Sequence, residues 1–178
     1  MKIGFIRHSK AIEKEFWDKD NALRPLSKNG IFRAKRFAAQ LLKFYKHDID
    51  YMITSDYAKT LETAEHIKKE IKPRHFIIDP VLNPGCDFIK FQNLIKSLPG
   101  DAEKVFIIGH SPDFPLIISE IIRDKKRMPY FKKPSIVEIE MVEFPYGKIS
   151  FTYNLDDGEE FPFKKHEPYL EEVGEIPL

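Results

Sequence analysis

The chain has 178 residues, is 42% hydrophobic and carries a formal net charge of +1, which suits one domain with its own core. A charge so close to zero gives no reason to expect nucleic acid or an anionic membrane as a partner, and no apolar run predicts a membrane span. The single cysteine, Cys86, excludes an internal disulfide, and the few apolar residues before Arg7 are too short for a signal-peptide core, so we expect a soluble cytoplasmic protein.

Strand-like and helix-like segments alternate through the first two thirds of the chain. Apolar runs predict strands at residues 2–6, 50–54, 75–79 and 104–109. Stripes with helical period follow each of these runs, at residues 27–48, 57–71, 87–98 and 113–124. Ser27 is a suitable N-cap for the first of the helices. This alternation is typical of an α/β fold with a mostly parallel sheet.

The end of the chain departs from this alternation. Two strand-like runs, at 135–142 and 148–154, are joined by EFPYGK, which predicts a hairpin and therefore a mixed sheet. We expect a single-domain, three-layer α/β/α fold over residues 1–154. Residues 155–178 are acidic, contain three prolines and show no clean period, so we expect a tail that wraps the domain or stays mobile.

Polar side chains follow three of the predicted strands at the point where each strand ends. The first strand ends in Arg7-His8-Ser9, and the fourth ends in GHSP, which carries His110. The second runs into TSDYAK, which places Lys59 in the first turn of the next helix. Ligands of open α/β sheets bind beyond the carboxyl ends of the strands, so we expect these groups to gather at one edge.

Two histidines, an arginine and a lysine at one edge would form an anion site. Cations without a counter-carboxylate are unfavourable in an empty protein, and a bound phosphate would neutralise them. The helix that starts near Asp56 or Tyr57 would add its N-terminal dipole to the same anion. One histidine is then a candidate nucleophile and the other a candidate donor to a phosphoryl oxygen.

Four stretches resemble motifs of one family, and they occur in the family's order. FIRHSKA resembles the Arg-His-Gly signature of the histidine phosphatase superfamily, and RPLSKNG is similar to its Pro-Leu-[Ser/Thr]-x-x-Gly stretch. ITSDYAKTLETAEHI resembles Ser-Pro-x-x-Arg-x-x-Gln-Thr-Ala, and VFIIGHSPDF resembles the second histidine motif, Val-Gly-His-[Asn/Ser]-Pro. The short spacing between the motifs is similar to the SixA-type phosphohistidine phosphatase branch. The resemblance implies a phosphoglycerate mutase-like fold and a metal-independent phosphatase without a cofactor.

The resemblance also implies a role for each matching residue. His8 matches the nucleophile that becomes phosphorylated, Arg7 a phosphate-binding arginine, and His110 the second histidine. The second family arginine falls on Lys59, which supplies a point charge without the bidentate fork of a guanidinium. Three further departures from the family pattern replace a usual Gly, Pro and Gln, and they lie at Ser9, Asp56 and Glu62. Ser9 is expected to constrain a turn that glycine makes freely.

The general acid and the substrate stay open at this point. Asp87 is the one carboxylate past Pro80 in the loop after the third strand, and its two interpretations are a helix N-cap, which we favour, and a leaving-group acid. The leading hypothesis is a phosphatase for phosphohistidine on a protein, because the imidazole of a phosphohistidine leaves far more easily than an alkyl alcohol does. The alternatives are a phosphomonoesterase for a small metabolite and a phosphate-binding module that has lost catalysis.

Two other features of the sequence have structural interpretations that need no catalytic role. Lysines and arginines crowd RDKKRMPYFKK, at residues 123–133, and a solvated loop is slightly favoured over a rim that attracts an acidic or phosphorylated partner. This loop has no aromatic ladder and does not indicate nucleic acid. Cys86 has no paired base and is expected to pack, and the histidines show no metal-ligand spacing.

Overall fold

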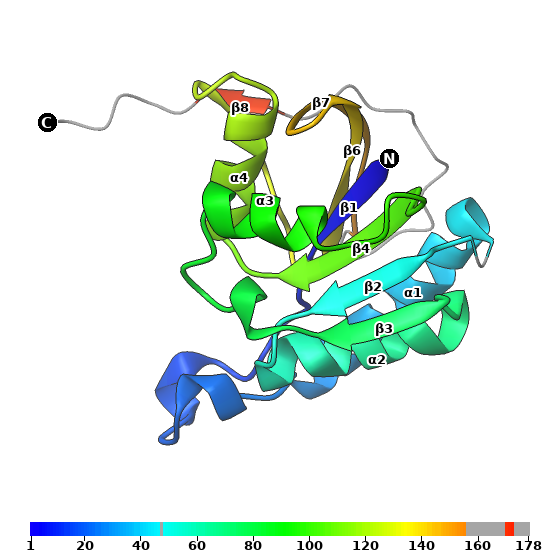
Figure 1. Ribbon diagram of the computed structural model, residues 1–178. Helices are drawn as coiled ribbons and strands as arrows, with labels where there is room; N and C mark the ends of the chain where they lie inside the picture. The colour runs from blue at the N-terminus through cyan, green and yellow to red at the C-terminus, as the bar shows by residue number, and fades with distance from the viewer. Residues whose placement is uncertain (47, 156–169, 173–178) are drawn as a thin grey trace, which may run out of the picture.

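The computed structural model describes residues 1–46, 48–155 and 170–172. A six-stranded sheet in the order β3-β2-β4-β1-β6-β7 forms its centre (Figure 1). The strands are β1 Lys2–Arg7, β2 Tyr51–Thr54, β3 His75–Ile78, β4 Lys104–Gly109, β6 Ser135–Glu143 and β7 Tyr146–Asn154. The first four are parallel, β6 is antiparallel to β1 and β7 is antiparallel to β6. The sheet is therefore mixed and mostly parallel, as predicted.

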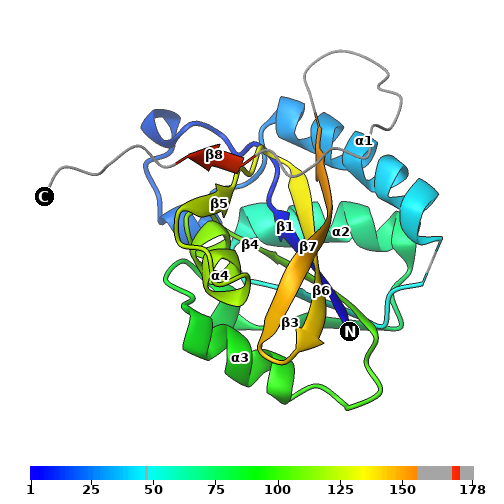
Figure 2. The same ribbon diagram turned by 90° about the horizontal axis from the view of Figure 1, so that it is seen from above.

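Four helices cover the two faces of this sheet. They are α1 Lys28–Tyr45, α2 Ala58–Ile71, α3 Phe88–Lys96 and α4 Asp113–Ile121. Seen from above, α1 and α2 lie on one face, and α3 and α4 on the other (Figure 2). Each pair closes its own apolar core, with Phe37 and Ile67 fully buried in one and Phe91 and Ile117 buried in the other. The three-layer α/β/α architecture is confirmed.

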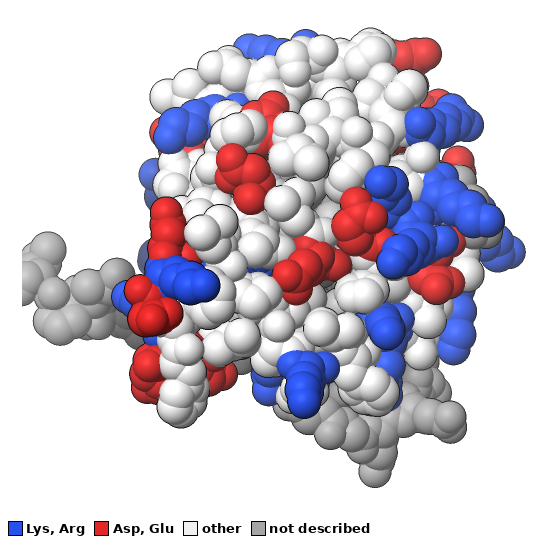
Figure 3. All heavy atoms as spheres, turned by 90° about the horizontal axis from the view of Figure 1, so that it is seen from below, with Lys and Arg blue, Asp and Glu red and all other residues white. Residues whose placement is uncertain are grey.

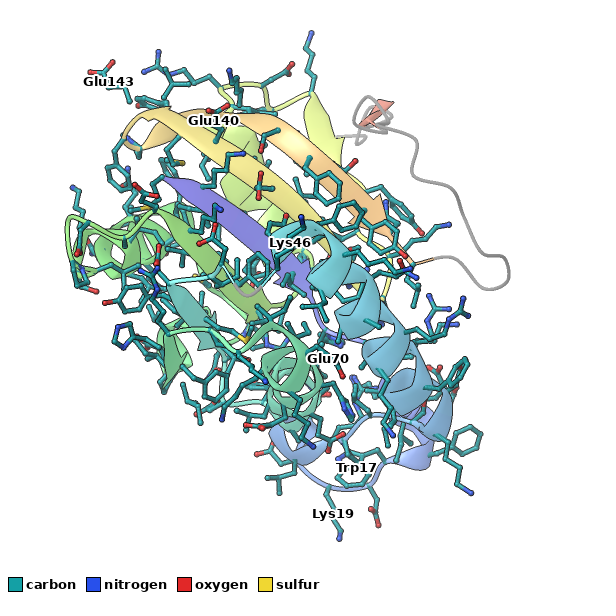
Figure 4. All side chains as sticks on the ribbon, turned by 90° about the vertical axis from the view of Figure 1, so that its right-hand side faces the viewer. Trp17, Lys19, Lys46, Glu70, Glu140 and Glu143 are labelled. Carbon is teal, nitrogen blue, oxygen red and sulfur yellow. The ribbon has the colours of Figure 1, made fainter. Side chains whose placement is uncertain are left out.

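The predicted elements lie close to the observed ones, and the short irregular elements were not predicted. Ser27 caps α1 by accepting a hydrogen bond from the Gly30 amide, as expected. Between β1 and α1 the chain forms two 3-10 turns, η1 Lys14–Phe16 and η2 Asn21–Leu23, and η3 Pro80–Leu82 follows β3. Trp17 and Lys19 lie at the outer end of the segment with η1 and η2, where the indole donates to the carbonyl of Asp20 (Figure 4).

The C-terminal part of the chain is described only in places. Leu155, the first residue of the predicted tail, is buried in the core beside α1. A short strand, β8 Leu170–Glu172, pairs antiparallel with β5 Arg127–Pro129. Residues 156–169 and 173–178 lie outside the described residues, so the division into a domain and a tail stays a prediction.

No helix in the described ranges is both long enough and apolar enough to cross a bilayer. On the face seen from below, basic and acidic side chains are interspersed (Figure 3). Such a mixed surface agrees with the net charge of +1.

Candidate active site

The carboxyl ends of β1, β2 and β4 bring the predicted residues together. Arg7 lies beside Gly109 in the β1–β4 pairing, and Thr54 lies beside Ile108 in the β2–β4 pairing. The amide of His8 donates to the carbonyl of Gly109, at 3.2 Å. These strand ends lie toward the left of Figure 1, near the segment that carries η1 and η2. The expected edge of the sheet therefore holds the expected residues.

His8 is held in one tautomer by the backbone. Its Nδ1 lies 2.6 Å from the carbonyl oxygen of Ser9. Because a carbonyl oxygen only accepts, Nδ1 carries the proton and Nε2 keeps its lone pair. Burial lowers the pKa of His8 well below its ordinary value, and the charges of Lys59 and Lys133 lower it further, whereas the Ser9 bond acts in the opposite direction. His8 is thus neutral, with a nucleophilic nitrogen.

His110 faces His8, with the two ring centres 5.5 Å apart. Its Nε2 lies 2.9 Å from the hydroxyl of Ser55, which in turn lies 2.6 Å from the hydroxyl of Thr60. Both hydroxyls are buried, and Thr60 also reaches the carbonyl of Tyr57 at 2.7 Å, so the chain fixes the imidazole ring. Burial, with the charges of Lys59 and Arg7, lowers the pKa of His110 to about 3.

Arg7 is anchored with part of its hydrogen-bonding capacity unused. One terminal nitrogen donates to the carbonyl of Phe131, while Nε is buried without a hydrogen-bond partner among the described residues. Burial lowers the pKa of Arg7. A buried donor without a partner is rare in folded proteins. A bound oxyanion would satisfy it.

Lys59 is buried in the first turn of α2, where only 4% of its surface is exposed. Its ammonium lies 5.2 Å from the centre of the Tyr57 ring. Burial, together with the charges of Arg24 and Lys133, lowers the pKa of Lys59 to about 8. Lys59 is therefore not an ordinary solvated lysine, and its side chain lies among the site's cations.

Two cations of the site were missed in the sequence. The guanidinium of Arg24 donates to the carbonyl of Ile12 at 2.6 Å and to the side chain of Asn21 at 2.9 Å. Lys133 is half-buried, and its charge acts on both His8 and Lys59. Arg24 opens the RPLSKNG motif, which was a usable signal. Lys133 belongs to the basic segment 123–133, whose rim interpretation was the less favoured one, and its place at the site depends on how β6 returns beside β1.

The departures from the family pattern fit the structure without strain. Ser9 is fully buried, its hydroxyl donates to the carbonyl of Gly30 at 2.8 Å, and its amide donates to Thr63 at 3.0 Å. Positive φ among the described non-glycine residues occurs only at Lys46, Lys72 and Arg123. The expected conflict between a side chain at position 9 and the local turn is therefore wrong.

Glu62 and Asp56, the other departures, lie in different surroundings. A carboxylate oxygen of Glu62 accepts from the amide of Leu26 at 2.9 Å, which ties α2 to the segment before α1. Asp56 is exposed, and its backbone amide donates to the side chain of Asn83 at 3.3 Å. Both positions therefore belong to the frame around the site.

Asp87 caps a helix. Its carboxylate accepts from the amide of Lys90 at 2.8 Å and forms the N-cap of α3, which confirms the favoured interpretation. Cys86 is buried in the core beside α3, and burial and nearby carboxylates raise the pKa of its thiol to about 11, so a packing role is confirmed. Within the described ranges, no group of His, Cys, Asp and Glu side chains could hold a metal ion.

Gly30 allows two segments of the site to meet. A Cβ atom at this position would lie 1.8 Å from the carbonyl oxygen of Lys10, which also accepts from the amide of Ser27. We expect Gly30→Ala to lower the free energy of unfolding by about 1 to 3 kcal/mol, because backbone has to move. Denaturant unfolding measures the change. Gly100→Ala is the control, since a Cβ atom there meets nothing within 4 Å, and equal stability of the two variants would contradict the close approach.

Similarity to known proteins is found among solved structures. No protein-family model and no curated protein sequence matches this sequence. The chain is similar to a protein histidine phosphatase SixA complexed with tungstate, at 21% identity and a TM-score of 0.74, over 85% of this chain and 96% of that one. It is also similar to a protein assigned as the phosphohistidine phosphatase SixA of Agrobacterium tumefaciens, at 14% identity and a TM-score of 0.71, over 88% and 98%.

A third structure extends the similarity beyond SixA. A mycobacterial glucosyl-3-phosphoglycerate phosphatase in complex with VO3 matches at 12% identity and a TM-score of 0.64, over 87% of this chain and 99% of that one. All three are matched over nearly their whole length. The chain therefore shares its fold with the SixA proteins and with this glucosyl-3-phosphoglycerate phosphatase.

Proposed function

We propose that the protein is a metal-independent phosphatase that passes a phosphoryl group to Nε2 of His8 and then to water. The observation that carries the proposal is the bond between His8 Nδ1 and the Ser9 carbonyl. It leaves an unprotonated nitrogen at the end of a strand that is surrounded by cations. The fold and the four sequence motifs support the same conclusion.

In the first step Nε2 of His8 attacks phosphorus in line with the leaving group. A bond forms between nitrogen and phosphorus while the bond to the leaving atom breaks with its electron pair. Arg7, Lys59 and His110 hold the equatorial oxygens, on which charge is spread in the transition state. The low pKa of His8 and of His110 keeps both rings neutral in the empty site, and the attack requires the neutral form of His8.

In the second step water attacks phosphorus from the side that the leaving group has vacated. The bond to Nε2 of His8 breaks, the nitrogen recovers its lone pair and inorganic phosphate leaves. Because Nδ1 keeps its proton and its bond to the Ser9 carbonyl throughout, His8 departs as neutral imidazole rather than as imidazolate. The same geometry thus serves both halves of the reaction.

A phosphohistidine on a protein is the substrate that the site favours. An alkyl alcohol leaves poorly without an acid, whereas the imidazole of a phosphohistidine leaves far more easily. Asp87 is committed to capping α3, and the charges that shift the pKa values of His8 and His110 come from Arg7, Lys59 and Lys133 and from the histidines themselves. No described carboxylate acts on either histidine.

The second candidate is a phosphomonoesterase for a small metabolite. The similarity to a glucosyl-3-phosphoglycerate phosphatase favours it, since that protein has the same fold. A phosphate-binding module without catalysis is the third candidate, because a lysine replaces the second arginine of the family pattern. Turnover of one phosphohistidine peptide against a panel of phosphate monoesters separates the three. We expect the peptide to be preferred. Faster turnover of a monoester would favour the second candidate, and no turnover at all the third.

Tungstate is a direct probe of the proposed oxyanion site. We expect it to raise the melting temperature, because it would bind only where Arg7, Lys59 and His110 are assembled in the folded protein. At a hundred times its Kd, linkage gives about 2.7 kcal/mol, which corresponds to roughly 5 to 10 °C for a domain of this size. Differential scanning fluorimetry measures the shift, with sulfate-free buffer and matched chloride as the control. An unchanged melting temperature at millimolar tungstate would argue against an oxyanion site.

A further inference from the structure

The loop before β6 lies beside the carboxyl end of β1. Ser135 pairs with Arg7 in the antiparallel register of β1 and β6. The carbonyl of Phe131, four residues earlier, accepts from the guanidinium of Arg7. Lys133 lies between these two points of attachment, so the loop carries it past Arg7.

Contacts on both sides hold this loop in place. Phe131 is buried against Phe114 of α4, with ring centres 6.2 Å apart. The carbonyl of Lys133 accepts from Arg33 Nε at 2.9 Å, and the hydroxyl of Ser135 donates to the carbonyl of Lys132 at 2.8 Å. The backbone at Lys133 is therefore fixed from the core side, which defines where its side chain begins.

The charges that act on the ammonium of Lys133 are mostly those of other cations. Arg7, Arg24 and Lys10 lower its pKa in addition to burial, and Glu13 is the acidic residue that acts in the opposite direction. The described part of the chain gives this ammonium no ion pair and no hydrogen bond. Gathering such charges costs free energy in the empty protein, and an anion at their centre would recover it.

Lys125 belongs to the same basic segment and is a solvent-exposed lysine with which Lys133 can be compared. Its side chain is 76% exposed and pairs with Glu120 at 2.9 Å. The solvated-loop interpretation fits Lys125, but it is wrong for Lys133.

We infer that Lys133 is a further ligand of the phosphoryl group and donates from its ammonium to a phosphoryl oxygen beside Arg7 and Lys59. The inference rests on the proposed function and adds a residue to its site. In this arrangement the loop at 131–133 serves the site twice, since its Phe131 carbonyl orients Arg7 and its lysine adds charge.

Tungstate binding to the full chain tests the inference. Lys133→Met keeps most of the aliphatic stem and removes the charge, and we expect it to raise the Kd for tungstate about tenfold to a hundredfold. Lys133→Arg should stay within a few-fold of wild type. Lys125→Met is the matched control from the same segment and should bind as wild type does. Isothermal titration calorimetry at fixed ionic strength gives all four constants.

Thermal stability without tungstate separates a ligand role from a structural one. Lys133→Met removes a like charge from beside Arg7 and Lys59, so we expect the melting temperature of the empty protein to stay equal or rise. A lysine that mainly supported the loop would instead lower it when replaced. A lower melting temperature together with unchanged tungstate affinity would overturn the inference.

The failure of the inference can be told from the failure of the proposed function. If wild type binds tungstate and Lys133→Met binds it equally well, Lys133 is not a ligand, while the proposed phosphatase site stands. If wild type binds no tungstate, the oxyanion site itself is wrong and the inference falls with it. Weaker binding in Lys133→Met, with binding retained in Lys133→Arg and in Lys125→Met, supports the inference.

Discussion

Replacing His8 with alanine is expected to lower turnover of a phosphohistidine peptide by about four orders of magnitude or more. The covalent route ends when Nε2 is removed, and the remaining cations can only orient a direct attack by water. The same change should abolish labelling of the protein by a radioactive phosphoryl donor. Rapid-quench labelling, with acid-lability of the product as the signature of a phosphohistidine, measures both effects.

His66→Ala is the matched control for this experiment. His66 lies half-buried on α2, and its pKa is also lowered, mainly by burial, but it takes no part in the site. Its replacement should leave labelling and turnover near the wild-type level. Near-normal turnover in His8→Ala, with the protein folded by circular dichroism, would remove His8 as the nucleophile.

The pKa of His8 also predicts the acid side of the pH profile. An imidazole attacks only in its neutral form, which prevails above its pKa. Because burial lowers that pKa well below 6.5, neutral His8 is expected to persist in mildly acidic solution. If activity were instead lost close to pH 6.5, the ordinary pKa of a histidine side chain, His8 would be more exposed to solvent than it is in the structure.

Much of the fold could be predicted because its signals are local. An apolar run such as the one in β4 is buried on both faces, which is what a central parallel strand requires. The stripes of α1 and α2 and the Ser27 cap are set by residues within a few turns of each other. The strand β5 is held by its distant partner β8, so no local pattern marks it. The turns η1 and η2 have local hydrogen bonds but are only three residues long and bury no side chain, so they show no hydrophobic period.

The residues of the site also differ in how far the sequence alone predicts their position. His8 and His110 come directly after strands, and Lys59 lies in the first turn of the helix that follows β2. The carboxyl ends of parallel strands meet at one edge of the sheet. Lys133 precedes an antiparallel strand, so its place depends on the register of β6 against β1. The hydroxyls of Ser55 and Thr60 beside His110 were likewise hidden, since serine and threonine near a helix start are more often caps.

Ser9 illustrates a limit of reasoning by residue type. A glycine in a family pattern suggests a backbone that only glycine adopts, yet position 9 has no positive φ here. The serine hydroxyl instead adds a bond to the carbonyl of Gly30, whose own missing Cβ is what lets Lys10 approach. This region does require a glycine, but at position 30, where the carbonyl of Lys10 approaches too closely for a Cβ atom.

Lys59→Ala is expected to lower turnover by roughly tenfold to a thousandfold, the range for loss of one electrostatic donor. Lys59 is buried among the site's cations, so its charge is less screened than that of a surface lysine. Lys59→Arg should keep or raise turnover, because a guanidinium can bind two oxygens at once. Steady-state kinetics with one phosphohistidine substrate compares both with Lys69→Ala, an exposed lysine on the same helix. Near-normal turnover in Lys59→Ala would remove Lys59 from the site.

The alkaline side of the pH profile gives Lys59 a signature of its own. Its pKa is lowered to about 8 in the empty protein, so the ammonium is charged below that pH and increasingly neutral above it. Tungstate affinity of wild type should therefore fall as the pH rises from 8 to 10, by up to about tenfold for each unit. Lys59→Arg should lose less affinity than wild type across the same range, since a guanidinium stays charged. Titration of both proteins at constant ionic strength isolates Lys59, because Lys133 titrates alike in the two. If the two profiles fall together, the charge that holds the anion is not that of Lys59.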